Sequence, residues 1–518
     1  MPNDLLEQVT AKIAALQAHV ETLLPGWRGA RDPEAVRAME LDVAAAAREM
    51  ADGIAGAVLR AIAADPVLQA EASLAARSEV SATGRSRRHG GVRSVEVTLL
   101  GGSSVSLDVE YQQPNYRSKK RRTKKKTRGK GGAGLFPVLA ALGIWFGVTP
   151  ALAGEVCRQI ADSDSVRAGR AALERRGILL SQRKALALLN SFSCRAVDQR
   201  RRWMDIIRQC PARVGPLRGK RVVVATDGGR IRQRVPAKAG RRRANGHQRY
   251  DAPWVEPKLL VIYVIDDEGK MLQEFRPVYD GTQQDCNAIF DMLEAYLKAL
   301  GAHEARQLIF VADGAKWIWE RTAALAVNLG VASEKVVEVV DKGHAVGTLY
   351  KIAEARKGWS TVESAEWIKK ARRLLRGGSS SALVAHIHGL AVGRNAKDIS
   401  SHEDYFARNE KRMQYRTFVK SHIPTGSGAV ESAVRRVINM RMKSNAMFWR
   451  EVNAEGMLLL RAYLKAERFD DLINWSLLAA APWWRLPSPA GPVAEPATTA
   501  THTSMASAAA DSMKRRAA

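Results

Sequence analysis

The sequence predicts a mixed α/β domain in the second half of the chain, preceded by a mainly helical N-terminal region with a small β-hairpin. Two observations predict the α/β domain. Apolar runs of strand length alternate with amphipathic segments of helix length between residues 220 and 342, and two of these runs end in an aspartate. The helical region is predicted by apolar residues that recur at helical spacing over residues 1–78. The 518 residues are enough for roughly three domains.

Residues 79–130 combine a linker, a β-hairpin and a basic arm. The segment TGRSRRHGG is expected to end the helical region, and SVEVTLLGGSSVSLDVEY alternates apolar and polar residues around a Gly-Gly turn. Ten of the fourteen residues 117–130 are basic, which fits a solvated tether and also an arm that contacts the DNA backbone. The candidate DNA contacts of this arm are Lys119, Lys120, Arg121, Arg122, Lys124, Lys125 and Lys126.

Residues 131–215 are expected to be helical. The uncharged run 131–154 has the length of a membrane span, but Pro137 and Pro150 interrupt it, so a buried helix is preferred. Ser181 is a predicted helix N-cap. The region suits either a helix-turn-helix-like DNA reader or ordinary helical packing.

The α/β domain is expected at residues 216–344 and 421–470. The predicted order is a strand, a β-hairpin, a helix, a strand, a helix and a strand, then a helical insertion at 345–420 and a final helix. The segment 482–518 is rich in Pro, Ala, Thr and Ser and is predicted to be disordered.

The composition restricts the function. The formal net charge of +28 favours a polyanionic partner, above all nucleic acid. The four cysteines include no C-x-x-C pair, which argues against structural zinc and a disulfide framework and fits a reducing cytosol. The sequence MPNDLLEQV does not resemble a signal peptide, and the absence of G-x-x-x-x-G-K-[ST] gives no support for ATP-driven action.

Three carboxylates are candidates for a metal site. Asp227 and Asp313 end apolar strands, and Glu431 begins a helix after a Gly-Ser-Gly loop. If the strands are parallel neighbours, the carboxylates meet at one edge of the sheet and suit two Mg²⁺ ions, with Mn²⁺ as a substitute. Each residue also has an ordinary explanation. An Asp before Gly forms turns, and Glu431 favours a helix N-terminus or pairs with Arg435.

Three blocks, VVVATDGG, LIFVADGAKWIW and GSGAVESAVRRVINMRMKSNAMFW, resemble the catalytic blocks of bacterial insertion-sequence transposases of the DDE type, in particular the Kra-type group with Mutator-like relatives. The resemblance covers about residues 220–465. It implies a ribonuclease H-like catalytic domain with a helical insertion before the third block. It also implies that Asp227, Asp313 and Glu431, spaced by 86 and 118 residues, are the catalytic, metal-binding triad.

The sequence departs from that family in two places. The family often has a cysteine-bearing, zinc-ribbon-like segment before the catalytic domain, where this chain has its basic run. In DKGHAVGTLYKI, His344 matches a histidine common in the family, whereas the following helix diverges. Asp341 is a rival carboxylate ligand, and His344 is either a phosphate contact, a proton carrier or a structural histidine.

Basic residues near the triad are further candidates for DNA contacts. Residues 229–250 carry eight Lys or Arg and no acid before Tyr250, and the Glu431 helix adds more, Arg436 among them. Trp449 either stacks on an unpaired base or packs in the core. The candidates for DNA contact in these two segments are Arg230, Arg232, Arg241, Arg242, Arg243, Arg435, Arg441 and Lys443.

The resemblance implies a DNA transposase of the bacterial cytoplasm, associated with the nucleoid. Such an enzyme binds the terminal inverted repeats of its element, cleaves the ends with activated water and joins the 3′ ends to double-stranded target DNA. Bringing two ends together implies at least a homodimer. The alternatives are a structure-selective nuclease of the same fold, a catalytically dead DNA-binding regulator, and a membrane-anchored basic protein based on residues 131–154.

Overall fold

The fold is described from a computed structural model, in which residues 2–29, 31–82, 87–114, 134–237, 249–391, 396–444 and 447–480 are placed. The chain forms two compact units. The first contains Met1–Glu155, Arg176–Leu179 and Asp470–Ala518, and the second contains Val156–Arg175 and Leu180–Phe469. The basic arm at 117–130, Arg241–Arg243 and the segment 482–518 lie outside the described residues.

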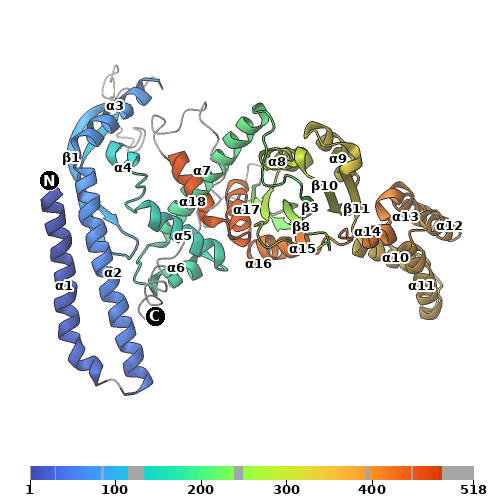
Figure 1. The fold of residues 1–518 in the computed structure, drawn as a ribbon, viewed down its shortest axis with the longest axis horizontal. Helices are drawn as coiled ribbons and strands as arrows, with labels where there is room; N and C mark the ends of the chain where they lie inside the picture. Colours follow the sequence, from blue (N-terminus) through green and yellow to red (C-terminus); the bar gives the residue numbers. More distant parts are fainter. Residues whose placement is uncertain are drawn as a thin grey trace, which may run out of the picture. The chain divides into compact units, whose positions relative to one another are not determined.

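The first unit is built from helices and one β-hairpin (Figure 1). A core of aliphatic side chains joins the second and third helices to the inner face of the hairpin, with Ala72, Val97 and Leu107 almost fully buried. Two further helices, α5 (Pro150–Asp162) and α18 (Phe469–Ala480), each contain a boundary between the units. The other elements are α1 (Pro2–Arg28), α2 (Pro33–Ala63), α3 (Pro66–Ala82), β1 (Arg87–Thr98), β2 (Ser104–Pro114) and α4 (Pro137–Ala141).

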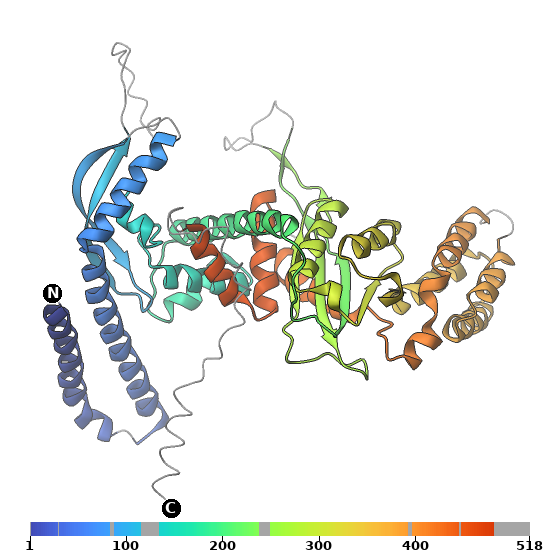
Figure 2. The same ribbon diagram turned by 45° about the horizontal axis from the view of Figure 1, so that its top comes forward.

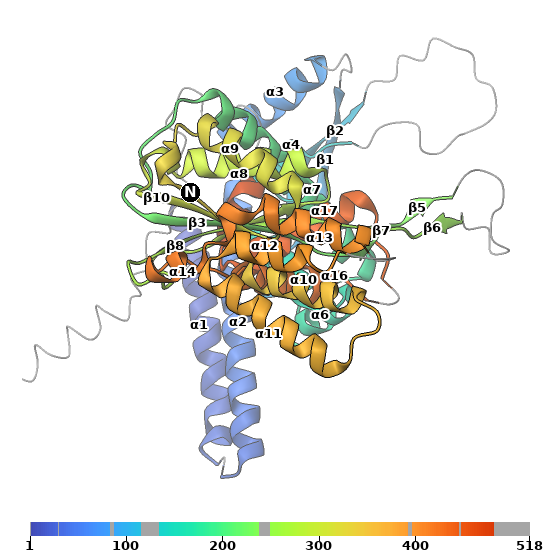
Figure 3. The same ribbon diagram turned by 90° about the vertical axis from the view of Figure 1, so that its right-hand side faces the viewer.

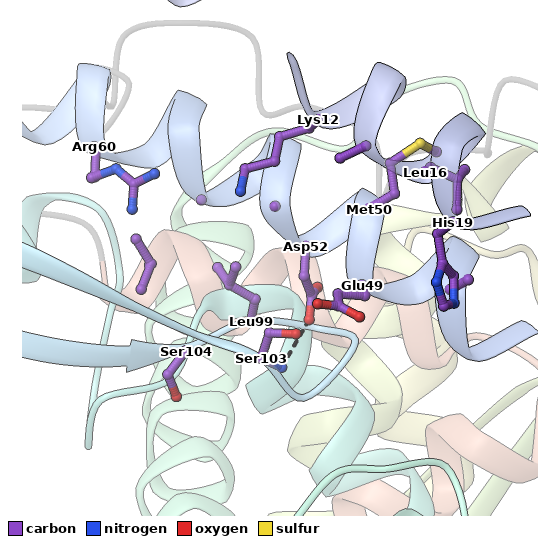
Figure 4. Close-up of a pocket in the computed structure, with 15 residues that line it drawn as sticks. Lys12, Leu16, His19, Glu49, Met50, Asp52, Arg60, Leu99, Ser103 and Ser104 are labelled. Atoms are coloured by element: carbon purple, nitrogen blue, oxygen red, sulfur yellow. Dashed lines mark hydrogen bonds between the residues drawn. The ribbon is translucent and has the colours of Figure 1, made fainter. Parts of the chain in front are cut away.

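The helix pair and the hairpin of this unit are joined by one buried carboxylate. Asp52 of α2 accepts hydrogen bonds from the backbone N–H of Gly101 and of Ser103, each at 2.9 Å, and so holds the β1–β2 turn. The same residue lines a pocket of about 500 Å³ between α1, α2 and this turn (Figure 4). The stem of Lys12 on α1 lies against Gly53 of α2 at the pocket.

The β-hairpin is longer than the sequence predicts. Its strands pair from Thr98 with Ser104 out to Arg87 with Pro114, so part of the predicted linker belongs to β1. A register shift between His89 and Val92 accommodates Gly91, whose φ of 86° favours glycine.

The prediction of a buried helix within residues 131–154 is confirmed only for the short segment Pro137–Ala141. The described part of this run forms the five-residue helix α4, followed by turns in which Gly143 and Gly147 have positive φ, before α5 begins at Pro150. The prolines and glycines break the apolar run into short pieces. Within the described residues, none of the helices has the length and apolarity that a membrane crossing requires.

The second unit contains a five-stranded mixed sheet in the order β11-β10-β3-β8-β9. Strand β10 is parallel to both of its neighbours, β3 and β11, whereas β8 is antiparallel to β3 and β9. Its strands are β3 (Arg221–Gly228), β8 (Lys258–Ile265), β9 (Val278–Thr282), β10 (Gln307–Ala312) and β11 (Val336–Val340). The predicted order of the sheet strands and of the helices between them is confirmed over residues 221–340, including the β8–β9 hairpin. Four short strands between β3 and β8 were not predicted.

Helices surround this sheet. Helix α7 carries the predicted N-cap Ser181, whose side chain accepts from the backbone N–H of Lys184. The helix clusters with the second unit, although the sequence groups it with residues 131–215. The helices are α6 (Val166–Glu174), α7 (Gln182–Gln209), α8 (Cys286–Ala299), α9 (Lys316–Asn328), α10 (Lys342–Ala355), α11 (Thr361–Gly377), α12 (Ser380–His388), α13 (Ala396–Arg408), α14 (Tyr415–Lys420), α15 (Gly428–Val434), α16 (Met440–Met442) and α17 (Glu451–Lys465). Shorter turns are η1 (Ala302–Glu304), η2 (Ser333–Lys335), η4 (Glu410–Met413) and the π-helical η5 (Arg435–Asn439).

A buried ion-pair network attaches α7 and α17 to the sheet. Arg200 of α7 donates to Asp280 of β9 at 2.7 Å and to Glu455 of α17 at 2.5 Å. The second oxygen of Asp280 accepts from the hydroxyl of Tyr296 on α8. The guanidinium thus compensates carboxylates that burial alone would make very unfavourable.

A short β-ribbon leaves the sheet directly after β3. Its two pieces are antiparallel, β4 (Ile231–Arg232) with β7 (Trp254–Val255) and β5 (Val235–Pro236) with β6 (Tyr250–Asp251). Figure 3 shows β5 and β6 projecting from the body of the unit. The ribbon carries the first part of the basic segment that follows Asp227.

Candidate active site

Three aspartates end three adjacent parallel strands of the sheet. In the ladders, Ala225 of β3 is paired with Val311 of β10, and Ala312 of β10 with Val340 of β11. Extending these registers places Asp227 beside Asp313, and Asp313 beside Asp341, at the carboxyl edge of the sheet. Neighbouring strands lie about 4.8 Å apart, so the three residues form a compact acidic row.

Glu431 reaches this edge from helix α15. The helix packs against β3, which carries Asp227, and against its antiparallel neighbour β8. A Cβ atom at Gly229 would lie 2.8 Å from side-chain atoms of Ile438, so glycine at this position allows the helical segment to approach the end of β3. The next turn of that segment is π-helical, an irregularity frequent at functional sites.

Asp341 uses its whole carboxylate to connect two helix N-termini. One oxygen accepts from the backbone N–H of His344 at 2.6 Å and lies 3.1 Å from Nδ1 of the same residue. The other accepts from the backbone N–H of Ser427 at 2.5 Å and from its hydroxyl at 2.9 Å. A carboxylate has about four acceptor positions, so Asp341 has little capacity left for a metal ion.

Ser427 lies between Asp341 and Glu431. Its Oγ is 2.9 Å from an oxygen of Asp341 and 2.7 Å from Oε1 of Glu431. A hydroxyl has one proton to donate, so the two carboxylates compete for it. Ser427 was not among the predicted site residues. The spacing Ser-x-x-x-Glu within GSGAVE, about one helical turn, places Ser427 on the same helix face as Glu431 and could have indicated it.

One group of three side chains offers ligand atoms that all lie within 4.8 Å of one another in the described part of the chain. It consists of Asp341, His344 and Glu431. The predicted triad of Asp227, Asp313 and Glu431 does not meet this spacing. The structure therefore brings two of the three secondary candidates, Asp341 and His344, to the same place as Glu431, whereas Trp449 is not part of this group.

Electrostatic coupling nevertheless includes Asp227 and Asp313 in the cluster. Burial, together with the charges of Asp313 and Glu431, raises the pKa of Asp227 to about 6, against the lowering effect of the Gly228 N–H and of His344. The hydrogen bond to Asp341 raises the pKa of His344, and the charges of Asp341, Asp313 and Asp227 act in the same direction. The raised pKa favours the protonated imidazole, which would supply an internal counter-charge for the carboxylates.

Packing fixes Asp313 at the end of β10. The indole N–H of Trp319 donates to the backbone oxygen of Asp313 at 2.9 Å. The carboxylate of Asp313 accepts from the backbone N–H of Ala315 at 3.0 Å. A Cβ atom at Gly314 would lie 2.0 Å from the ring of Tyr405, so glycine here lets the helical insertion approach the site. The pKa of Tyr405 is raised by burial and by the charges of Asp313 and Asp341. No sequence pattern singled out Tyr405.

The described basic candidates differ in exposure. Arg230, Arg435 and Lys443 are exposed, whereas Arg232 is half-buried with its guanidinium 4.9 Å from the ring centre of Trp254. These four residues lie on the ribbon or on the segment that follows Glu431.

Arg441 does not extend an exposed positive surface, as the sequence analysis expected. It is 5% exposed, and its guanidinium lies 5.4 Å from the ring centre of Trp449. Trp449 is itself held by a hydrogen bond from Nε1 to the backbone oxygen of Met442, at 3.0 Å. Both side chains thus help to pack the segment after α16, and for Trp449 this agrees with the packing alternative.

Fold and site together define a class of protein: a mixed α/β domain with a carboxylate cluster at the carboxyl edge of three parallel strands. No protein-family model matches the chain, and no curated protein matches it. Among solved structures, the chain is similar to the "Drosophila P element transposase strand transfer complex", with 12% identity, a TM-score of 0.21, and coverage of 62% of this chain and 80% of that chain. At this TM-score the likeness carries no argument about fold or function.

Proposed function

We propose that this chain is a DDE-type DNA transposase with a ribonuclease H-like catalytic domain. It would bind the terminal inverted repeats of its element, cleave the ends by metal-assisted hydrolysis and join the 3′ ends to target DNA by transesterification. The observation that carries the proposal is the row of Asp227, Asp313 and Asp341 on adjacent parallel strands, with Glu431 facing it from α15.

The donor set fits Mg²⁺, with Mn²⁺ as a substitute. Carboxylate oxygens are the ligands that these hard ions prefer. Burial, together with the charges of Asp313 and Glu431, raises the pKa of Asp227, and a bound cation would offset this penalty on its charged form. Asp227, Asp313 and Glu431 would hold the ions, because Asp341 is already saturated by hydrogen bonds. When bound, a pair of such ions supplies an activated water or 3′-hydroxyl and stabilises the departing oxygen.

The chain's own residues have separate tasks in this proposal. Asp341 positions Ser427, and with it the start of the helix that carries Glu431. His344 balances the acidic cluster. The exposed Arg230, Arg435 and Lys443 would contact phosphates and hold the scissile bond near the carboxylates.

The direct test uses the full-length protein and DNA that carries the inverted repeats flanking its gene. We expect Mg²⁺-dependent cleavage at the repeat ends and transfer of the 3′ ends to a target plasmid. Cleavage of branched DNA without strand transfer would favour the structure-selective nuclease. Tight binding without any metal-dependent cleavage would favour the regulator.

The raised pKa of Asp227 predicts a pH-dependent effect on stability. Its folded-state pKa of about 6 lies above the ordinary value of 3.8, so the folded protein binds more protons and the free energy of unfolding falls as pH rises from about 4 to 6. Asp227→Asn removes this cost. We expect the metal-free variant to be about 1–3 kcal/mol more stable than wild type at pH 8 and similar at pH 4.

Thermal unfolding in EDTA at the two pH values measures this effect. Asp267→Asn is a control with the opposite expected sign. Asp267 is exposed in the turn after β8, and its hydrogen bond with Arg306 lowers the pKa of its carboxyl, so this variant should lose stability at pH 8 relative to pH 4. Mg²⁺ should raise the melting temperature of wild type more than that of Asp227→Asn. If Asp227→Asn were less stable than wild type at pH 8, the raised folded-state pKa of Asp227 would be contradicted.

The exposed basic residues predict a change in salt dependence. Removing two phosphate contacts in Arg230→Gln/Lys443→Gln should reduce the slope of log Kd against log salt by about two and weaken binding to all DNA sequences alike. Fluorescence anisotropy over a salt series measures the slope. Arg218→Gln, which precedes β3 at the opposite edge of the sheet, should leave it unchanged.

A further inference from the structure

Helix α1 leaves an apolar stripe uncovered along most of its length. None of the described side chains of α1, residues 4–28, is buried. Leu6, Ile13 and Leu24 are 66%, 50% and 38% exposed. Their separations of seven and eleven residues are close to whole numbers of helical turns, within about 20°, so the three side chains lie on one face.

The stripe lies beside a hollow and belongs to an extended helix pair. A hollow of about 470 Å³ on α1 itself is lined by Leu6, Glu7, Thr10, Ala11 and Ala14. The small alanine side chains leave room for side chains of another helix. Figure 2 shows α1 and α2 as two long antiparallel helices whose connecting turn extends away from β1 and β2. Among the described residues of this unit, α2 is the element that lies beside that end of α1.

Charge excludes nucleic acid as the occupant of this face. Residues 1–63 carry nine acidic and six basic side chains, whereas the whole chain has a net charge of +28. A DNA-binding face would need the opposite balance. The occupant must therefore be apolar along the stripe and must tolerate an acidic surrounding.

A second copy of α1, in antiparallel orientation, meets these requirements. A two-fold axis near residue 15 places Leu6 of one copy against Leu24 of the other. It places Ile13 opposite Gln17 and brings the two Ile13 residues to about 6 Å from each other along the axis. The same axis brings the acidic start of α1, with Asp4 and Glu7, toward the end of the other helix, which carries Arg28. A single patch can thus pair with itself, as a two-fold interface requires.

We infer that the α1–α2 helix pair is a homodimerisation element, in which two copies pack through the Leu6–Ile13–Leu24 stripe to form an antiparallel four-helix bundle. The interface needs no DNA and no metal ion. It is therefore independent of the proposed transposase activity, and its failure would leave that proposal untouched.

The first test is the mass of the full-length chain in solution without DNA. We expect twice the chain mass of 56.8 kDa by sedimentation at micromolar concentration. Ile13→Glu/Leu24→Glu should weaken association at least about 100-fold, since each copy then places charges in the apolar seam. Val327→Glu is the matched control, because Val327 is 76% exposed on α9 of the other unit and should leave the dimer intact.

The second test does not depend on a destabilising variant. Mixing Leu6→Cys chains with Leu24→Cys chains under mild oxidation should give a covalent dimer, above the background from the wild-type cysteines. Within one chain these positions are about 27 Å apart along the helix, too far for a disulfide. A monomer in the first test, or a dimer that neither responds to the glutamates nor crosslinks between 6 and 24, would overturn the inference. The inference would also be overturned if Ile13→Glu/Leu24→Glu remained a dimer and lost DNA binding.

Discussion

Neutralising any one of Asp227, Asp313 or Glu431 should reduce Mg²⁺-dependent end cleavage and strand transfer by at least about 10³-fold. Charge stabilisation by a catalytic metal contributes several kcal/mol, and each 1.36 kcal/mol corresponds to a factor of ten in rate. The variants Asp227→Asn, Asp313→Asn and Glu431→Gln keep the size of each side chain. The rates of both steps are to be measured at saturating DNA with Mg²⁺ and with Mn²⁺.

DNA affinity should change less than threefold in these variants, because basic residues supply it. Asp267→Asn, with its carboxylate at the other edge of the sheet, should retain wild-type rates. A variant of the three that cleaves at the wild-type rate would remove that residue from the metal site. Full activity in Asp227→Asn and in Asp313→Asn, together with an inactive His344→Ala, would instead favour the tighter group of Asp341, His344 and Glu431 as the metal site.

Asp341→Asn should reduce both stability and turnover. The carboxylate accepts from His344 and Ser427 through both oxygens, and an amide presents N–H groups where one side needs an acceptor. Losing one or two of these hydrogen bonds in a buried place should cost about 2–3 kcal/mol. Because Ser427 then no longer fixes the start of α15, we expect cleavage at saturating DNA to fall about 10²-fold.

Two measurements separate a positioning role of Asp341 from a merely structural one. At a temperature where the variant is fully folded, the cleavage rate should fall while the Kd for DNA stays constant. Ser427→Ala, which keeps the backbone donor and loses the hydroxyl, should show a smaller loss. Asp32→Asn alters a helix-capping aspartate of the first unit and should leave cleavage unchanged. If Ser427→Ala reduced the cleavage rate more than Asp341→Asn, the proposal that Asp341 positions Ser427 and the start of α15 would be contradicted.

The strands and helices of the second unit were predictable because their signals are local. Strand β8 is a run of buried residues, and the Asp-Asp-Glu-Gly turn contains Gly269 with a φ of 81°, a conformation that favours glycine. Helices α8 and α9 are followed by Gly301 and Gly330, both with positive φ. Each of these features depends on residues within a few positions of one another.

The support of the site was not predictable, because it depends on contacts between distant segments. Asp341 and Ser427 are 86 residues apart along the chain and meet only in the folded protein. The burial of Arg441 depends on Trp449 and on the segment after α16, which a count of basic residues does not reveal. Apolar spacing likewise identified α1 as a helix, whereas its uncovered face became visible only with α2 in place.

The helical insertion leaves the sheet and returns to it at almost one point. Asp341 begins α10 and binds Ser427, and the backbone N–H of Lys342 donates to the oxygen of Thr425 at 2.9 Å. The two ends are thus clamped together independently of what lies between them. The insertion could therefore change in size, or be replaced by another segment whose ends meet in the same way, without changing the chemistry at the edge of the sheet. This requires that the contacts Asp341–Ser427 and Lys342–Thr425 are kept.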